Sequence, residues 1–451
     1  MWKKTKEIVN KLTPAQMIVI YYFLAVTIST IMLRIPLALN PGVKLEWIDA
    51  LFVAVSAVSV TGLSTVDVSQ TFSVPGIFIL MFVLQFGGIG IMTLGTFLWL
   101  IFGKKIGFKE RRLIMADQNQ ATFSGLVDLL IQLLKIILLI EIIGGLVLSF
   151  YFLRYFPDWK EASLHGIFAS VSATTNGGFD ITGASLIPYA DDYFVQFVNI
   201  ILIILGAIGF PVLIELKRFL FERPADYKFR FSLFTKLTSM TFAFLIIGGT
   251  ILIYLLEREY FFSDKSWHAS FFYSLFQSVS TRSGGLSTMN VSDFTEPTLL
   301  LLSGLMFIGA SPSSVGGGIR TTTFALNLLF LYHFAQGNKS IKIFKREIHE
   351  EDIKKSLVVS MMAIIICFSS ILILIITERF TLIEIIFEVC SAFGTTGMSM
   401  GITSDLTTFG KFVIMVLMFI GRVGIISFLF MIGGKEKKIS YHYPKERIII
   451  G

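Results

Sequence analysis

The chain has 451 residues, of which 54% are hydrophobic and only 15% are charged. Soluble domains carry roughly a quarter charged residues, so this composition excludes a soluble globular protein and predicts a chain that crosses a membrane several times. The formal net charge of +7 does not indicate a nucleic-acid partner, because 26 of the 38 Lys and Arg residues fall at the two ends of the chain and in three connecting segments.

These basic stretches predict the topology instead. They are the N-terminus, the C-terminus and the segments Gly103 to Val127, Lys217 to Lys236 and His333 to Lys355. By the positive-inside rule all five face the cytoplasm. No small-residue cleavage site closes the first apolar run, so we expect no cleaved signal peptide. Cys367 and Cys390 both lie in apolar runs without metal or disulfide spacing, and we expect them to be packing residues.

The first unit of the chain holds two apolar stretches long enough to span a bilayer and one that is too short. Residues 17–37 and the stretch from Pro75 to about Phe102 each meet the ~20 residues that a span needs. Between them, Trp47 to Val58 would reach roughly 18 Å as a helix and cannot cross. The predicted unit is therefore a span, a short re-entrant helix, an irregular loop and a second span.

The same unit recurs three times along the chain. The predicted spans and re-entrant helices are 128–153, 163–174 and 192–216 in the second unit, 237–256, 268–280 and 297–332 in the third, and 357–376, 381–393 and 408–433 in the fourth. Every unit starts and ends on the basic side, so the repeats are parallel about an axis along the membrane normal and not inverted. The predicted fold class is an all-α integral membrane protein with four parallel span–pore-helix–span repeats, eight transmembrane helices in all, around a pseudo-four-fold pore.

We expect the chain to divide at the basic stretches. The predicted divisions are a cytoplasmic N-terminus at 1–16, the first repeat at 17–102, a connector and second repeat at 103–216, a connector and third repeat at 217–332, a connector and fourth repeat at 333–433, and a cytoplasmic tail at 434–451.

Each re-entrant helix is followed by a segment that is rich in Ser, Thr and Gly and ends in glycine plus a large apolar residue. The first of these segments is Val58-Ser-Val-Thr-Gly-Leu-Ser-Thr65. The glycines that align are Gly62, Gly178, Gly285 and Gly397, separated by 178 − 62 = 116, 285 − 178 = 107 and 397 − 285 = 112 residues. A near-constant period of this kind indicates repeated structural units.

The chemistry of these segments suits a cation. Irregular backbone at membrane depth must be buried in protein or line water, and four such loops that face one axis can replace the hydration shell of an ion with carbonyl oxygens. Glycine permits the positive φ values that turn carbonyls inward, and the re-entrant helices point their partially negative C-terminal ends at the site. The predicted selectivity filter consists of Val60, Thr61, Gly62, Asn176, Gly177, Gly178, Ser283, Gly284, Gly285, Thr395, Thr396 and Gly397.

Two further patterns share the period. A glycine motif stands in each closing span, as Gly87-Gly-Ile-Gly90, Gly206-Ala-Ile-Gly209, Gly309-Ala-Ser-Pro312 and Gly421-Arg-Val-Gly424. Small residues also permit close helix packing in membranes, and that interpretation stays open beside a pore-lining role. An acidic residue follows each filter segment, and these residues either concentrate cations at the mouth or are ordinary solvated loop charges. They are Asp67, Asp180, Asp293 and Asp405.

Taken together, the four-fold plan, the filter segments and the Gly-Arg-Val-Gly motif resemble the Trk/Ktr/HKT superfamily of potassium transporters, over nearly the whole chain. The short tails are most similar to the membrane subunit of a bacterial Ktr system, of the KtrB or KtrD type. This resemblance implies K⁺ as the permeating ion, held at Gly62, Gly178, Gly285 and Gly397. In plant relatives that admit sodium the first filter often carries serine, so Gly62 implies a potassium preference.

The third closing span differs from the other three because Pro312 and the run Gly316-Gly-Gly318 interrupt it. Such a run breaks any helix, and at membrane depth it must lie in the water-filled pore below the filter. In the family the matching segment is the intramembrane gating loop. We expect a gate formed by Gly309, Ala310, Ser311, Pro312, Ser313, Ser314, Val315, Gly316, Gly317 and Gly318, with Arg422 facing the pore against it.

Other charges at membrane depth need a partner or water. Arg282 lies within the third filter segment, and we expect it to point behind the filter, with Glu384 and Glu388 as candidate partners. We interpret Glu141, Lys135 and Asp49 as structural. The five histidines show no ligand spacing and no nucleophile motif is present, so we expect no enzymatic activity and no organic cofactor on this chain.

The resemblance also implies partners. Nucleotide sensing would belong to a separate cytoplasmic ring of RCK-type subunits, of the KtrA or KtrC type, that binds ATP or ADP. The apolar end of the tail, Tyr441 to Gly451, predicts packing at a homodimer interface. The overall hypothesis is K⁺ uptake across the bacterial cytoplasmic membrane. The alternatives are a sodium-permeable or poorly selective member of the superfamily and an ion-coupled secondary carrier, and dependence on Na⁺ stays open.

Overall fold

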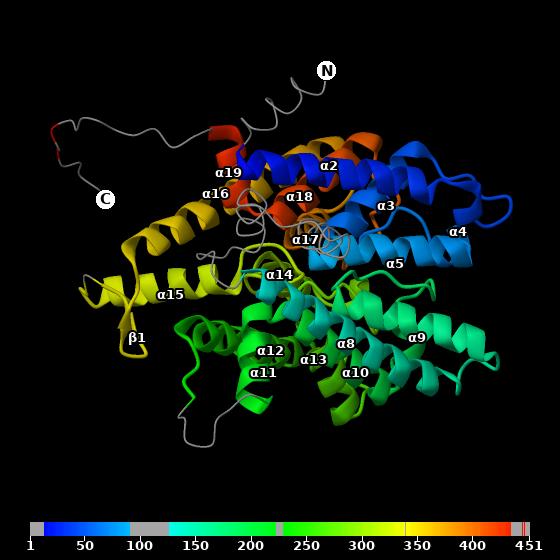
Figure 1. Cartoon of the computed structure of the whole chain (residues 1–451), viewed down its shortest axis with the longest axis horizontal. Helices are drawn as coiled ribbons and strands as arrows, with labels where there is room; N and C mark the ends of the chain where they lie inside the picture. Colours follow the sequence, from blue (N-terminus) through cyan, green and yellow to red (C-terminus); the bar gives the residue numbers. More distant parts are fainter. Residues whose placement is uncertain are drawn as a thin grey trace.

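The computed structural model describes residues 13–90, 126–221, 229–338, 340–433, 444 and 446. In these residues the chain is almost entirely helical, which confirms the predicted all-α class (Figure 1). The first spans of the four repeats are α2 (Pro14–Leu33), α8 (Leu126–Phe152), α12 (Leu233–Glu257) and α16 (Glu350–Thr377). The short re-entrant helices, here called the pore helices, are α3 (Trp47–Ser59), α9 (Trp159–Thr174), α13 (Trp267–Ser280) and α17 (Leu382–Gly394).

The closing spans are shorter helices, several of them in two pieces. They are α5 (Val74–Ile89), α10 (Tyr193–Ala207) with α11 (Phe210–Phe221), α14 (Glu296–Phe307) with α15 (Thr321–Ala335), and α18 (Thr408–Val423) with α19 (Ile425–Gly433). Connecting turns are η1 (Pro36–Ala38), α4 (Val68–Thr71), η2 (Ile187–Tyr189) and η3 (Val291–Asp293). A two-residue hairpin, β1 (Lys342–Ile343) and antiparallel β2 (Arg346–Glu347), joins α15 to α16.

Side-chain caps explain where several helices begin. Ser73, Ser232 and Ser266 each accept a hydrogen bond from a backbone N–H in the first turn of the helix that follows. Such a cap satisfies one of the free donors at a helix start. Asp158 caps α9 in the same way, so that helix begins at Trp159, four residues before the predicted Ser163 (163 − 159 = 4).

The closing spans correct one expectation. The sequence predicts continuous helices at 75–102, 192–216 and 408–433 and a break only in the third repeat. Instead, α5 ends before Gly90 (φ 96°), α10 and α11 meet at Gly209 (φ 104°) with a bend of 106°, and α18 ends before Gly424 (φ 86°). Positive φ favours glycine and is incompatible with an α-helix. The last glycine of the motif therefore stops the helix in the first, second and fourth repeats.

The first glycine of the same motif has a different role. A Cβ atom at Gly87 would lie 2.6 Å from the carbonyl oxygen of Ala57, and one at Gly206 would lie 2.2 Å from that of Thr174. At Gly421 the corresponding distance to the carbonyl oxygen of Phe393 is 2.1 Å. Each contact joins a closing helix to the pore helix of its own repeat. Close packing is therefore one of two functions of this motif.

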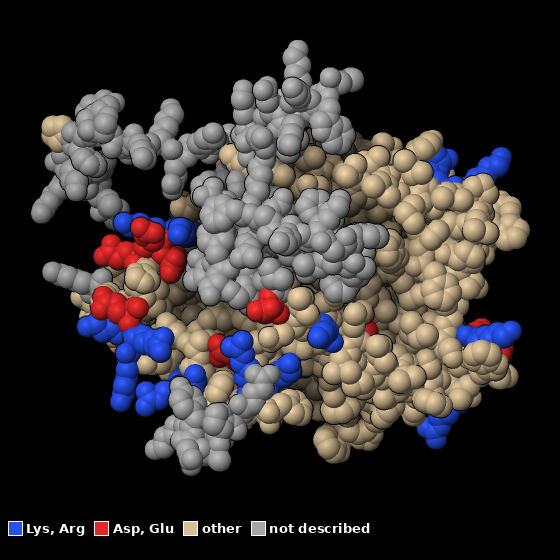
Figure 2. Space-filling model, viewed as in Figure 1, with Lys and Arg blue, Asp and Glu red and all other residues tan. Residues whose placement is uncertain are grey.

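The four repeats form a closed ring. Each closing helix also packs against the pore helix of the next repeat: α5 against α9, α10 against α13, α14 against α17, and α18 against α3. Among the described residues, four helices are long and apolar enough to cross a membrane, namely α2, α8, α12 and α16, and α10 with α11 makes a fifth if counted as one bent span. The long helices run side by side, while α15, α16 and the β1–β2 hairpin extend from one end of the bundle (Figure 1). Figure 2 shows charged side chains at both ends and an uncharged belt between them.

Candidate functional site: the ring of four filter segments and the loop beneath it

The four predicted filter segments share one backbone conformation. In each triplet the first and third residues have positive φ and the middle residue does not. The first-position values are 57° for Val60, 54° for Asn176, 67° for Ser283 and 47° for Thr395. The third-position values are 97° for Gly62, 67° for Gly178, 72° for Gly285 and 95° for Gly397. Non-glycine residues rarely adopt positive φ, so four aligned instances mark a shared and specialised geometry.

The four glycines also meet in space. A Cβ atom at Gly62 would lie 2.9 Å from the Cα of Gly178, and one at Gly178 would lie 3.0 Å from the Cα of Gly285. A Cβ at Gly285 would lie 3.4 Å from the Cα of Gly397, and one at Gly397 would lie 3.0 Å from the Cα of Gly62. The contacts close a ring in the order of the chain. Residues more than 300 positions apart in sequence (397 − 62 = 335) thus meet in one ring.

A serine near the end of each pore helix holds the filter segment in place. In the first and fourth repeats, Ser56 Oγ accepts from Gly62 N–H and Ser391 Oγ accepts from Gly397 N–H, each at 3.1 Å. In the second, Ser172 Oγ donates to the carbonyl of Phe179 at 2.6 Å, and in the third Ser280 donates to the carbonyl of Leu286. A supporting role for these serines was not expected from the sequence. Their spacing is nevertheless regular, because three of them stand six residues before the filter glycine and the fourth stands five before it.

The interrupted segment of the third repeat lies against the filter segments. A Cβ at Gly316 would lie 2.5 Å from Ser283 Oγ, and one at Gly317 would lie 2.6 Å from Thr395 Oγ1. These glycines therefore allow the loop to sit directly beside the first residues of the third and fourth filter triplets. Within the loop, Ala310 N–H donates to the carbonyl of Gly317 at 3.1 Å, and this hydrogen bond joins the two ends of the loop.

Neighbouring closing helices hold this loop at their breaks. Ser311 N–H and Val315 N–H donate to the carbonyls of Ala207 (3.0 Å) and Gly206 (3.3 Å) at the end of α10. The loop also accepts a hydrogen bond, because Phe210 N–H donates to the carbonyl of Ser313 at 2.8 Å. The breaks in the other spans thus create the free backbone groups that the loop needs.

Two arginines bind the loop from the side that carries the β1–β2 hairpin. Arg422 donates to the carbonyls of Val315 and Gly87, and to that of Gly88 at 3.2 Å. Arg320 donates to the carbonyl of Gly316 and to that of Ser311 at 3.4 Å. Arg422 was expected at this place and Arg320 was not, although a charged residue that ends a broken intramembrane segment is itself a signal.

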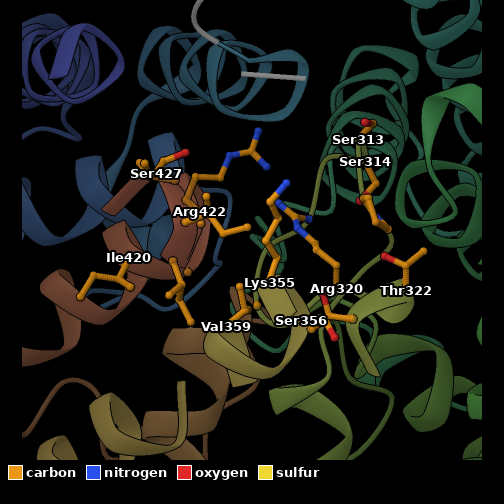
Figure 3. Close-up of a pocket in the computed structure, with 18 of the residues that line it drawn as sticks. Ser313, Ser314, Arg320, Thr322, Lys355, Ser356, Val359, Ile420, Arg422 and Ser427 are labelled. Carbon is orange, nitrogen blue, oxygen red and sulfur yellow. The ribbon is translucent and has the colours of Figure 1, made fainter. Parts of the chain in front are cut away.

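Both arginines extend into a cavity of about 600 Å³ between the loop and the helices α15, α16 and α19 (Figure 3). Lys355 points into the same space, and Ser313, Ser314 and Thr322 lie on its opposite side. Three basic side chains and the carboxylate of Asp352 thus line the space on this side of the loop.

Arg282 lies behind the third filter segment and is completely buried. It donates to the carbonyls of Leu305 and Ile308 (3.2 Å for Ile308) and to Thr281 Oγ1 at 3.3 Å. The expected partners were wrong, because the C-terminal end of α14 supplies carbonyl oxygens with partial negative charge at this place. Helix α14 ends there only because the loop follows it.

The two glutamates proposed for Arg282 have other roles. Glu384 Oε2 accepts from the backbone N–H and the hydroxyl of Thr381, both at 2.7 Å, and so forms a capping box at the start of α17. Glu388 is buried and accepts from Ser399 Oγ (2.8 Å) and Thr403 Oγ1 (2.5 Å). Glu388 thus holds the chain that leaves the fourth filter segment.

Most of the remaining predicted charges have local partners. Asp49 forms an ion pair with Lys411 at 2.8 Å, and Glu141 accepts from Gln85 Nε2 at 2.6 Å, so each joins two helices. Lys135 is exposed on α8. Asp67 Oδ1 caps α4 by accepting from Ser69 N–H at 2.8 Å, and Asp180 Oδ2 accepts from Thr182 N–H at 3.1 Å. The tail segment Tyr441 to Gly451 lies outside the described residues except for Pro444 and Glu446.

Comparison with known proteins agrees with this geometry. A family model described as TrkH, a cation transport protein, matches residues 1–436. The chain is 62% identical over 99% of both chains to the Ktr system potassium uptake protein D of Bacillus subtilis (strain 168), and 36% identical to protein B of the same system and organism, over 98% of this chain and 97% of that one. It is 32% identical to the potassium/sodium uptake protein NtpJ of Enterococcus hirae over 99% of both chains.

The crystal structure of the potassium transporter TrkH from Vibrio parahaemolyticus shares the fold, with a TM-score of 0.73 and 19% identity over 92% of this chain and 84% of that one. The resemblance that the motifs suggested is therefore confirmed. The chain belongs to the TrkH family of cation transport proteins.

Proposed function

We propose that this chain is the potassium-conducting membrane subunit of a Ktr-type uptake system. The observation that carries the proposal is the ring of Gly62, Gly178, Gly285 and Gly397, in which four segments with one backbone conformation converge. Convergent backbone carbonyls can replace the hydration shell of a monovalent cation. Transport of this kind needs no catalytic residue on the chain and no organic cofactor.

The loop from Gly309 to Gly318 is the gate in this proposal. It occupies the space beside the filter, and its carbonyls are bound by Arg320 and Arg422, which adds an electrostatic barrier to the steric one. Gating then requires the loop to leave the breaks of α10 and α18. By the positive-inside rule, the basic connecting segments favour a cytoplasmic location for the β1–β2 end of the bundle and for both termini.

The proposed setting is the bacterial cytoplasmic membrane, with two copies of the chain forming a homodimer in which each copy keeps its own pore. A separate cytoplasmic ring of nucleotide-binding subunits would control the gate. The names of the two Bacillus subtilis relatives, each a protein of a Ktr system, are consistent with a system of several components. The α15–β1–β2–α16 arm projects farthest from the bundle and leads directly into the loop, so it is well placed to transmit such control (Figure 1).

The second candidate is a channel that also admits Na⁺. The similarity to a protein named for potassium and sodium uptake favours it. Glycine at all four ring positions favours K⁺, because a side chain at any one of them would narrow or distort the passage.

Ion uptake by a bacterial strain that lacks its own potassium uptake systems tests both candidates. We expect the wild-type chain with its regulatory subunit to restore growth at low K⁺ and to accumulate Rb⁺ in preference to Na⁺. A Gly62→Ser variant should lose most of this preference, because its Cβ would lie 2.7 Å from the carbonyl oxygen of Gly177.

Gly248→Ser is the matched control, since a Cβ at Gly248 has nothing within 4 Å. It should behave as wild type. Equal accumulation of Na⁺ and Rb⁺ by the wild-type chain would favour the second candidate, and uptake of neither ion by an inserted, folded chain would contradict both.

A further inference from the structure

Helix α11 lies across the direction of the helix before it. The bend between α10 and α11 is 106°, and α11 has 12 residues, a length of about 18 Å. In Figure 1 it runs nearly perpendicular to the long helices, beside the start of α12. In a bundle whose long helices cross a bilayer, such a helix lies in the plane of the membrane. It is also at the end of the bundle that carries the β1–β2 hairpin.

The first half of α11 packs on the gating loop. Phe210 and Leu213 are buried in one cluster with Val315 of the loop and with Ile89 at the end of α5. The hydrogen bond from Phe210 N–H to the carbonyl of Ser313 attaches the first residue of α11 to the same loop. A displacement of α11 therefore cannot leave the loop where it is.

The second half of α11 is exposed, and its exposed side chains are apolar and basic. Leu216, Leu220 and Phe221 are 41%, 61% and 80% exposed, and Arg218 is exposed on the side of the helix opposite Leu216. The acidic residue of this helix, Glu215, is turned away to accept from Ser232 N–H at 3.0 Å. A helix with apolar side chains and a basic residue on its exposed face suits the boundary between acyl chains and anionic headgroups.

We propose that α11 is a membrane-surface helix whose exposed second half binds anionic phospholipid, and that this contact holds the gating loop in place beside the filter. Leu216, Leu220 and Phe221 enter the acyl region, and Arg218 binds headgroup phosphate. Because α11 and the loop share a cluster and a hydrogen bond, lipid binding and loop position are coupled. This inference rests on the proposed gating function of the loop, whereas the placement of α11 against lipid does not.

A depth measurement tests the placement without any transport assay. A nitroxide label on Leu220→Cys should be more accessible to dissolved oxygen than to a water-soluble nickel chelate in vesicles of phosphatidylcholine and phosphatidylglycerol. The native Cys367 and Cys390 are 5% and 8% exposed, so they should take up little label. The matched control is Lys345→Cys in the exposed turn between β1 and β2, which should show the reverse order.

Either of two results would overturn the proposed occupant. A label at residue 220 that is accessible mainly to the nickel chelate would place this face in water. A disulfide between two copies of the Leu220→Cys variant would make it an interface between copies of the chain.

A flux measurement tests the coupling. The purified chain in phosphatidylcholine vesicles should carry several-fold more Rb⁺ than in vesicles that also contain phosphatidylglycerol. Arg218→Glu should lose most of this sensitivity, while Lys342→Glu, an exposed basic residue at the same end of the bundle, should keep it. Equal sensitivity of Arg218→Glu and wild type would refute the coupling. Absence of any Rb⁺ flux would contradict the proposed function itself, and the label would still decide where α11 lies.

Discussion

The ring of filter segments and the closing helices beneath it come from the same four repeats, yet they differ in how far they keep the four-fold pattern. In the ring, every repeat contributes a triplet with the same positions of positive φ and a serine support. Below it, every closing helix stops, and the three whose continuation lies in the described residues continue differently. The third repeat inserts a loop, the second turns by 106°, and the fourth continues as the nine-residue helix α19.

This difference separates two physical demands. An ion on the axis contacts all four repeats equally, so ligand geometry favours four similar segments. A gate needs one element that moves and others that hold it, so similarity is a disadvantage there. The loop uses the free carbonyls of Ala207 and Gly206, which exist only because α10 stops at that point. The repeats are therefore alike in the filter segments and differ in the closing helices beneath them.

The largest effect is expected from one methyl group added to the ring of Gly62, Gly178, Gly285 and Gly397, where the four repeats are alike. We expect Gly285→Ala to abolish most Rb⁺ uptake, because the new Cβ would lie 2.3 Å from the carbonyl oxygen of Thr396. The positive φ of 72° adds roughly 1–2 kcal/mol of backbone strain for any L-residue other than glycine. Uptake normalised to the amount of protein in the membrane measures the effect.

Gly248→Ala controls for the loss of a glycine at an open position. A Gly285→Ala chain that transports Rb⁺ as well as wild type would show that the ring does not line the ion path.

Removal of the loop tests the closing helices and the loop between them, where the four repeats differ. Deletion of Ser313 to Gly317 should raise Rb⁺ flux several-fold in the absence of the regulatory subunit, because it removes the carbonyls that Arg320 and Arg422 bind and empties the space beside Ser283 and Thr395. Flux into vesicles reconstituted with the purified chain is the measurement. The selectivity for Rb⁺ over Na⁺ should change little, since the ring is intact.

The appropriate control for this deletion lies in an exposed turn, such as Phe344 and Lys345 between β1 and β2. An inserted, folded chain without Ser313 to Gly317 whose flux equals that of wild type would exclude the loop as the gate.

Much of the ring of filter segments was predictable, because the four repeats keep a regular spacing in the sequence. The spacing of Gly62, Gly178, Gly285 and Gly397 aligns the repeats, and a span too short to cross marks each pore helix. Pro312 and three consecutive glycines likewise reveal the loop. Each of these features can be read from the sequence without knowing which residues meet in space.

The remainder depends on contacts between stretches far apart. The partners of Arg282 are carbonyls at the end of α14, and backbone carbonyls carry no sequence signature, so two glutamates were expected instead. Breaks at Gly90, Gly209 and Gly424 were missed because a single glycine is compatible with both close packing and a helix stop. The charge of Arg320 was a signal in the sequence, but the carbonyl of Gly316 that it binds carries none.

The smallest expected effect comes from the serine supports, and it tests whether the four quarters of the ring are energetically equivalent. Ser391→Ala removes the acceptor of Gly397 N–H and should lower the free energy of unfolding by about 1 kcal/mol, with a modest loss of selectivity. Ser172→Ala instead frees the carbonyl of Phe179. A carbonyl at the outer edge of the filter can turn toward water, whereas an amide beside the ring has no other acceptor, so Ser391→Ala should have the larger effect on Rb⁺ over Na⁺ discrimination. Thermal unfolding in detergent and paired ion uptake measure the two consequences, with Ser263→Ala, an exposed serine that bonds only within its own turn, as control. Equal losses at the two positions would mean that the ring is held as one rigid unit and that the direction of each serine bond is irrelevant to the ion.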